Sequence, residues 1–189
     1  IGETVLGFSI GTVAGIIVAS LLWWSNLLSQ VLDPYIVILN SIPKVALGPV
    51  LIVWLGTGLR PVVAMAIATS VIVTIMMIHT GFKTIDPNKI KLMRTFGATR
   101  FQIFMKVVIP ASVPTMIAAL KVSVGLSLVG TIVGEFLGSK AGLGYLIVYG
   151  GQVFNMSLVM AAVIMLSIVS SLMYYLVTLL ERRVTKYRN

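Results

Sequence analysis

The chain has 189 residues, of which 58% are hydrophobic and 10% are charged, and its mean hydropathy is +1.06. Soluble domains carry about 25% charged residues, so this composition excludes an ordinary soluble domain and indicates a protein whose solvent is lipid. Cysteine is absent, which excludes disulfides and thiolate metal sites, and the net charge of +9 comes mainly from basic residues clustered at 83–106 and 182–188.

Five apolar segments are long enough to cross a hydrocarbon core, which takes about 20 helical residues. Backbone groups in lipid must be paired within the protein, so these segments are expected to be helices, and the strand-like alternation of a barrel does not recur. The fold class predicted is an all-α membrane protein, a polytopic transmembrane helix bundle. Its spans are expected at about 4–24, 34–55, 62–79, 112–136 and 157–180.

Basic residues beside apolar spans mark the cytoplasmic side of a membrane protein. A nucleic-acid-binding surface is the alternative for a basic chain, but it needs a soluble basic face that this sequence does not offer. We therefore expect the segment 83–110 and the tail 182–189 to be cytoplasmic. Counting spans backwards places residue 1 outside, and a sixth helix before Ile1 would restore a cytoplasmic start.

The first span carries small residues four positions apart, at Gly7, Gly11, Gly15 and Ala19. This spacing places them on one face of a helix, where a neighbouring helix can approach closely. The face is expected to pack inside the bundle, with a contact between two copies of the chain as the alternative.

The second span is expected to be broken, because Pro43 and Pro49 lie inside it. Broken helices near the membrane midplane often line a transport path. Lys44 follows the first of these prolines, and an ionisable residue at that depth is a functional candidate. Pro43 and Lys44 are therefore candidates for a translocation path, with snorkelling of the lysine toward the cytoplasmic face as the alternative.

The fourth span adds Lys121 and Glu135 to the path candidates. Lys121 is expected at a depth similar to that of Lys44, where two cations suit an anionic solute or, equally, snorkelling. Glu135 precedes a glycine-rich stretch, 138–151, which predicts a tight turn into a short helix at the outer face. His79, at the inner end of the third span, is expected to be an interfacial residue rather than a catalyst.

The basic segment 84–110 has the signals of two short helices joined at a glycine. Asp86 and Pro87 are a helix cap and a first helical residue, and Gly97 can adopt the left-handed conformation that ends a helix. Thr99 can cap a second short helix over 100–109, which is expected to end at Pro110. An amphipathic helix lying on the bilayer is the alternative, but it does not explain the glycine, the second cap and the aromatic residues that flank the turn. A docking element for a soluble partner explains all three.

The spacing from Gly97 to Val107-Val108-Ile109-Pro110 resembles the EAA loop of binding-protein-dependent ABC importer permeases. The stretches "SIPKVALGPVLIVWLGTG", "GEF" and "GLGYLI" resemble the nitrate, sulfonate and taurine branch of that family. The likeness extends over nearly the whole chain. One departure is that Lys91-Leu92-Met93 stands where the family has Glu-Ala-Ala.

This resemblance implies that residues 1–189 form a single ABC transporter transmembrane domain in a prokaryotic plasma membrane. Its partners would be two ATPase subunits, a second permease copy and an extracytoplasmic binding protein, in contact with membrane lipid and without nucleic acid. The chain would not be an enzyme and would hold no cofactor or metal, because ATP and Mg²⁺ belong to the partner ATPases. The segment 84–110 would be the ATPase-coupling loop, with Lys91, Leu92, Met93, Arg94, Phe96, Gly97, Arg100, Phe101 and Pro110 as its contact residues.

The function predicted is therefore a type I importer permease that moves a small solute inward by alternating access. Nitrate, sulfonates, taurine and vitamin precursors are the substrates that the resemblance suggests, and the two lysines favour an anion. A channel or secondary transporter without an ATPase is the alternative. It is opposed by the lack of an evident inverted repeat and of intramembrane acids other than Glu135.

Overall fold

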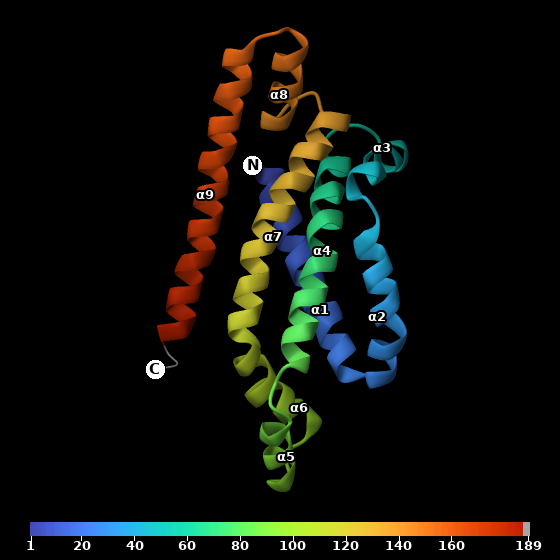
Figure 1. Ribbon diagram of the computed structural model, residues 1–189, viewed down its shortest axis with the longest axis vertical. Coiled ribbons are helices and arrows are strands. Elements are labelled where there is room, and N and C mark those ends of the chain that lie inside the picture. Colours follow the sequence, from blue (N-terminus) through green and yellow to red (C-terminus); the bar gives the residue numbers. More distant parts are fainter. Residues whose placement is uncertain (187–189) are drawn as a thin grey trace.

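The computed structural model describes residues 1–186, and within that range it is built from helices and turns without strands. Three long helices form its centre: α1 (Gly2–Trp24), α4 (Leu59–Lys83) and α7 (Ile109–Gly138) (Figure 1). The middle helix α4 packs against both of the others. In the most apolar 18-residue stretch of α4, 50% of the residues are buried. The corresponding share is 6% for the peripheral helix α9 (Met156–Lys186).

Small residues bring these three helices together on both sides of α4. A Cβ added at Gly11 of α1 would lie 2.7 Å from the Ser70 hydroxyl oxygen, and one at Gly15 would lie 2.6 Å from a Thr74 methyl carbon. The predicted small face of α1 is therefore an internal packing face. On the other side of α4, a Cβ at Gly130 of α7 would lie 2.6 Å from the Met65 carbonyl oxygen.

Hydroxyl groups add polar contacts across the same interfaces. Thr69 Oγ1 donates to the carbonyl of Leu126 on α7 at 2.9 Å, and the Thr74 and Ser123 hydroxyls lie 2.6 Å apart. Bonds of this kind between membrane helices contribute about 0.6 kcal/mol on average. These bonds therefore add a modest contribution to the close packing at the glycines.

The second span differs from the predicted 34–55. It consists of α2 (Asn26–Ser41), a 3₁₀ turn (Lys44–Leu47) and α3 (Gly48–Leu55), with a bend of 85° between its two halves. The break falls at Ile42 and Pro43, whereas Pro49 is the second residue of α3, in the first turn, where a missing N–H costs nothing. The span starts earlier than predicted because Ser25 caps α2 by accepting from the Leu28 N–H at 3.2 Å.

Among the described residues, four helices are long and apolar enough to cross a membrane, and the bent pair raises the number to five. This agrees with the predicted bundle of about five spans. The predicted turn and the short helix that follows it are also present, as Gly142 with φ +118° and α8 (Leu143–Gln152). The last helix reaches Lys186, so the end of the predicted tail 182–189 lies outside the described range.

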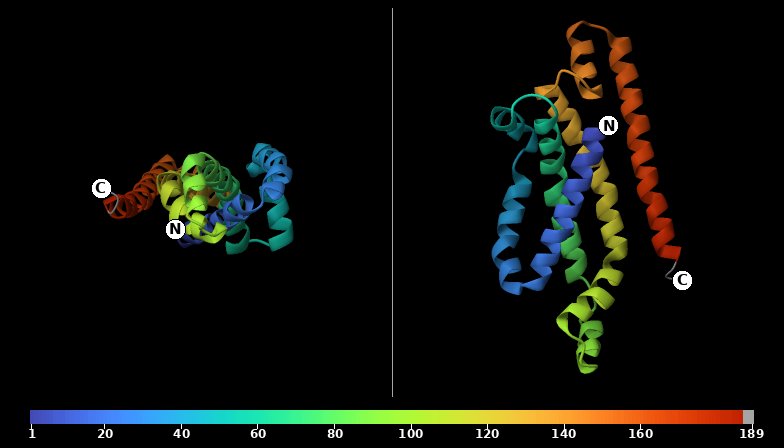
Figure 2. Two further views of the ribbon diagram at one scale, coloured as in Figure 1. Left: turned by 90° about the horizontal axis from the view of Figure 1, so that it is seen from below. Right: turned by 180° about the vertical axis from the view of Figure 1, so that it is seen from behind.

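Two ends of the molecule can be distinguished (Figure 2). At one end lie the turn between α1 and α2, the end of α9, and the short helices α5 (Pro87–Thr95) and α6 (Arg100–Ile103). At the other end lie α3, α8 and the start of α1. The basic segment and the C-terminal helix end thus lie toward one side, as the charge pattern requires.

Candidate functional site

The elbow, residues 86–103, projects beyond the bundle and is shaped by local hydrogen bonds. The Asp86 carboxylate accepts from the Asn88 N–H at 2.8 Å, and Pro87 is the first residue of α5. After α5, Gly97 adopts φ +75° and its N–H donates to the Arg94 carbonyl at 2.9 Å. The Ala98 N–H donates to Met93 at 3.0 Å, so the carbonyls at the end of α5 are paired and the chain reverses sharply.

The second half of the elbow starts with a reciprocal cap. Thr99 Oγ1 accepts from the Gln102 N–H at 3.3 Å, and the Gln102 side chain accepts from the Thr99 N–H at 2.8 Å. The helix does not end at Pro110 as predicted. A π-helical turn over Phe104–Val108 follows α6 and leads directly into α7, so residues 100–138 form one helical run. In this wider turn the Ile109 N–H donates to the Phe104 carbonyl, five residues back. The turn accommodates Pro110 without breaking the helix.

The apolar residues of the elbow divide into an inner and an outer set. Ile103 and Phe104 are buried in a cluster with Ile78 and Phe82 of α4. The Phe104 ring lies 4.8 Å from the ring of Trp23 on α1. The outer set comprises Leu92, Phe96 and Phe101, which are 57%, 76% and 57% exposed. These three residues define the exposed apolar face of the elbow.

Charged residues surround this face. Lys91, Arg94 and Arg100 are all exposed, whereas Met93 is half-buried against the inner cluster. Lys91 thus stands on the surface at the position where the resemblance expects glutamate. The predicted coupling residues therefore lie on the projecting elbow, except that Pro110 lies at the start of α7. Met93 faces inward, and Arg94 and Arg100 lie on the side of the elbow near the α1–α2 turn.

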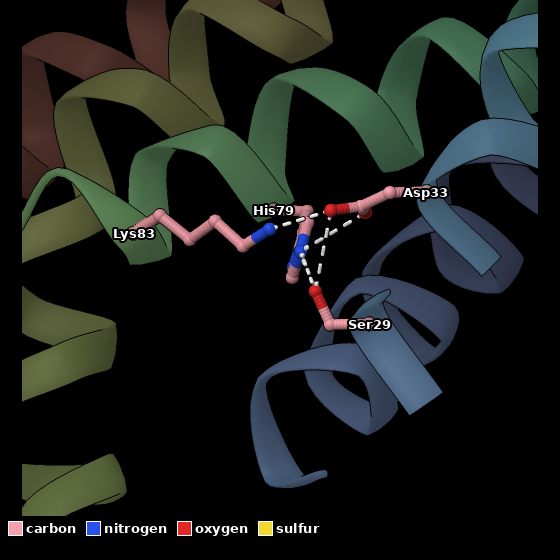
Figure 3. A network of polar contacts seen from close by, with 4 residues as sticks. All are labelled: Ser29, Asp33, His79 and Lys83. Atoms are coloured by element: carbon pink, nitrogen blue, oxygen red, sulfur yellow. Dashed lines mark hydrogen bonds and ion pairs between the residues drawn. The ribbon is translucent and has the colours of Figure 1, made fainter. Parts of the chain in front are cut away.

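A polar network joins α2 to the last turns of α4, directly before the elbow (Figure 3). Lys83 Nζ lies 2.7 Å from Asp33 Oδ2, and His79 Nε2 lies 3.0 Å from the Ser29 hydroxyl oxygen. The Ser29 hydroxyl donates to Asp33 at 3.4 Å. A hydroxyl has one hydrogen to donate, so with Ser29 donating to Asp33 it can accept from a protonated His79 Nε2, which also lies 3.6 Å from Asp33 Oδ1.

Sequence reasoning missed this network. It described His79 as an isolated interfacial residue, and it began the second span at residue 34, just beyond Asp33. The structure buries His79 and places Asp33 and Lys83, which are 50 positions apart, in one ion pair. The Asp33 and Lys83 side chains are 41% and 51% exposed. Exposed ion pairs contribute little to the free energy of folding, so this pair mainly orients α2 relative to α4.

The translocation-path candidates do not meet in one place. Pro43 lies at the break of the second span, and Lys44 donates to the carbonyl and side-chain oxygens of Asn40. Gly48, four residues after Lys44, contacts Leu137 at the C-terminal end of α7, whereas Lys121 lies 16 positions earlier on that helix. At 1.5 Å per residue this separation is roughly 24 Å, so the two lysines do not share a depth as predicted.

Lys121 has a partner of its own. Its Nζ lies 2.6 Å from a Glu181 carboxylate oxygen on α9, and 5.6 Å from the centre of the Tyr174 ring. This ion pair neutralises the charge of Lys121 and links α9 to α7. The expectation of two free cations facing an anionic solute therefore loses its geometric support.

Glu135 caps α8, which lies at the end of the molecule opposite the elbow. It is 4% exposed, and its carboxylate accepts from the Gly144 N–H at 2.5 Å, within the first turn of α8. Helix N-termini carry unpaired N–H groups and partial positive charge, which a carboxylate complements. A Cβ at Gly144 would lie 2.9 Å from the same carboxylate oxygen, so glycine is needed for this approach.

Replacing Glu135 by alanine is expected to lower the free energy of unfolding by about 1–3 kcal/mol, because a buried N–H of α8 loses its acceptor. Glu135→Gln should retain most of the stability, since the amide oxygen can still accept. Thermal unfolding of the purified protein in detergent measures both. Equal melting temperatures for Glu135→Ala and the parent would contradict the capping role.

No group of three or more metal-binding side chains occurs among residues 1–186. What distinguishes the molecule is a capped, projecting elbow that continues rigidly into a long membrane helix.

Comparison with known proteins connects this architecture to transport. The family described as "Binding-protein-dependent transport system inner membrane component" matches residues 11–186. A probable ABC transporter permease protein of Haemophilus influenzae is 30% identical over 96% of this chain and 74% of its own length. The formylaminopyrimidine transport permease ThiX of Halalkalibacterium halodurans is 29% identical over 74% and 56% of the two chains. The putative aliphatic sulfonates transport permease SsuC of Bacillus subtilis is 28% identical over 97% and 67%.

Solved structures share the fold. A chain of the inward-facing MetNI methionine ABC transporter superposes with a TM-score of 0.85 at 22% identity, covering 97% of this chain and 91% of its own. A chain of an amino acid ABC transporter superposes with a TM-score of 0.69 at 20% identity, covering 96% and 89%.

Proposed function

Because the chain belongs to the family of binding-protein-dependent transport system inner membrane components, we propose that it moves a small solute inward under the control of partner ATPases. Members of this family are membrane permeases and not themselves enzymes. In this proposal ATP and Mg²⁺ bind the partners, and the chain converts their closure into alternating access of a pore.

The observation that carries the proposal is the exposed apolar face of the elbow. Leu92, Phe96 and Phe101 are exposed on the elbow, and an exposed apolar patch of this kind is characteristic of a binding surface. The elbow is also continuous with α7 through residues 100–138, so a displacement of the face moves a membrane helix directly. We therefore expect a partner ATPase that binds this face to open or close the translocation path.

The assembly proposed contains two copies of the chain, two ATPases and an extracytoplasmic binding protein. Each copy of the chain forms a single transmembrane domain. It lies in a prokaryotic plasma membrane, with residues 83–110 and the tail 182–189 cytoplasmic. The elbow and the end of α9 lie toward one end of the molecule, which supports this orientation.

The substrate proposed is a small solute such as a sulfonate, nitrate or a vitamin precursor. Relatives at similar identity are named for formylaminopyrimidine and for aliphatic sulfonates, so chain similarity alone does not choose between these classes. The ion pair of Lys121 with Glu181 removes one reason to prefer an anion.

Co-purification tests the proposal. An ATPase encoded beside this permease should be retained by the parent chain, and the double variant Phe96→Ser/Phe101→Ser should weaken its binding at least about tenfold, because aromatic anchors dominate such contacts. Phe154→Ser is the matched control, since this exposed phenylalanine lies in the turn between α8 and α9 at the other end of the molecule. Uptake without any ATPase would instead establish the channel or secondary transporter.

A further inference from the structure

A basic cleft of about 270 Å³ lies between the α1–α2 turn, the end of α4 and the elbow. Its charged lining consists of Lys83 from α4, Arg94 from α5 and Arg100 from α6. Its apolar walls include Trp23, Phe82 and Ile90. The coupling function proposed above uses the exposed apolar face of the elbow. Arg94 and Arg100, which flank that face, also line this cleft, and the coupling proposal gives the cleft itself no role.

The cleft has an excess of positive charge. No aspartate or glutamate lines it. The carboxylate of Asp33 bonds to Lys83, but neither Arg94 nor Arg100 has a carboxylate partner within the described part of the chain. Arg100 lies over the ring of Trp23, 5.9 Å from its centre. Two arginines without a carboxylate partner, from two helices, beside a lysine that is paired with Asp33, favour binding of an anion.

The surroundings identify the kind of anion. The cleft lies where the apolar spans end, beside Trp23 and Trp24, and tryptophans are enriched at membrane–water interfaces. Basic pockets between membrane helices at this level suit lipid headgroups. Apolar walls beside the cations suit an amphiphile rather than a free inorganic ion. The volume of about 270 Å³ is many times the roughly 10–15 Å³ that a cavity needs to hold one water molecule, so the cleft has room for a phosphate group.

We propose that this cleft binds the phosphate headgroup of an anionic phospholipid, with Arg94 and Arg100 as its main ligands and Lys83 as a third cation. Guanidinium groups bind phosphate oxygens in pairs, which an ammonium group cannot do. A bound headgroup would join the elbow to the α1–α2 turn, and so set the angle at which the elbow projects.

Titration of the lipid-stripped, full-chain permease followed by native mass spectrometry tests the site. Phosphatidylglycerol should bind more tightly than phosphatidylcholine, and Arg94→Gln/Arg100→Gln should weaken phosphatidylglycerol binding about 30-fold. The matched control is Lys89→Gln/Lys106→Gln, which removes two exposed charges from the same segment without touching the cleft. It should retain nearly the affinity of the parent. The measurement needs no ATPase, so its outcome does not depend on the proposed function.

Three results would overturn the proposal. The parent chain could bind phosphatidylglycerol and phosphatidylcholine equally. This comparison uses no variant, so it does not depend on how well a variant folds. The control variant could lose as much affinity as the arginine variant, in which case charge alone attracts the lipid. Finally, glycerol 3-phosphate could bind as tightly as phosphatidylglycerol, which would assign the cleft to a soluble phosphate compound.

Discussion

ATP-driven uptake is expected to fall to background when Gly97 is replaced by valine, while the amount of protein in the membrane stays unchanged. Gly97 has φ +75°, and no other atom would lie within 4 Å of an added Cβ. The obstacle is therefore the backbone conformation and not the space. A residue other than glycine held in this region costs about 1–3 kcal/mol, and most for a β-branched one.

The strain at residue 97 can be relieved by opening the elbow. That change would move Phe96 relative to Phe101, and so separate the two halves of the exposed apolar face. Gly97→Asn is the control, because asparagine tolerates the left-handed region, and it should keep most of the uptake. Vesicle uptake with the ATPase present measures both variants. Normal uptake by Gly97→Val would show that the elbow geometry does not matter for coupling.

The second large effect concerns stability. Gly130→Val is expected to lower the free energy of unfolding by about 3 kcal/mol or more. A Cβ at this position would lie 2.6 Å from the Met65 carbonyl oxygen and 2.8 Å from the Ala66 Cα, both on the backbone of α4. Backbone atoms cannot rotate away as a side chain can, so α4 and α7 must separate and their shared contacts weaken.

The same helix provides the control for this variant. Gly125 is exposed on α7, and no atom would lie within 4 Å of its added Cβ. Gly125→Val should therefore change stability by less than about 1 kcal/mol. Unfolding by a denaturing detergent, monitored by circular dichroism, compares the two variants. Equal loss at residues 125 and 130 would mean that the close approach of α4 and α7 does not determine stability.

The position of Lys91 bears on how the partner is recognised. It is exposed at the start of the outer face, where the resemblance expects an acid, and no described carboxylate pairs with it. In the assembly proposed, the ATPase groove would have to present an acid or leave this position uncontacted.

The number of spans and the shape of the elbow could be predicted from the sequence because local physics determines both. Lipid permits only segments whose backbone is paired internally, so apolar length alone indicates the helices. The caps at Asp86 and Thr99 and the turn at Gly97 involve groups at most five residues apart, and their chemistry is visible in a short stretch.

The tertiary structure alone decided which residues meet. Asp33 and Lys83, and likewise Lys121 and Glu181, lie 50 and 60 positions apart and become partners only through helix packing. It also decided which aromatic residues of the elbow face inward, and that Pro43 breaks a helix whereas Pro34 does not. In spans that are apolar on every side, the hydrophobic residues show no helical periodicity. Their sequence therefore does not indicate which face packs inside the bundle. Their contacts are set by shape, as at Gly130, and shape is a property of two helices together.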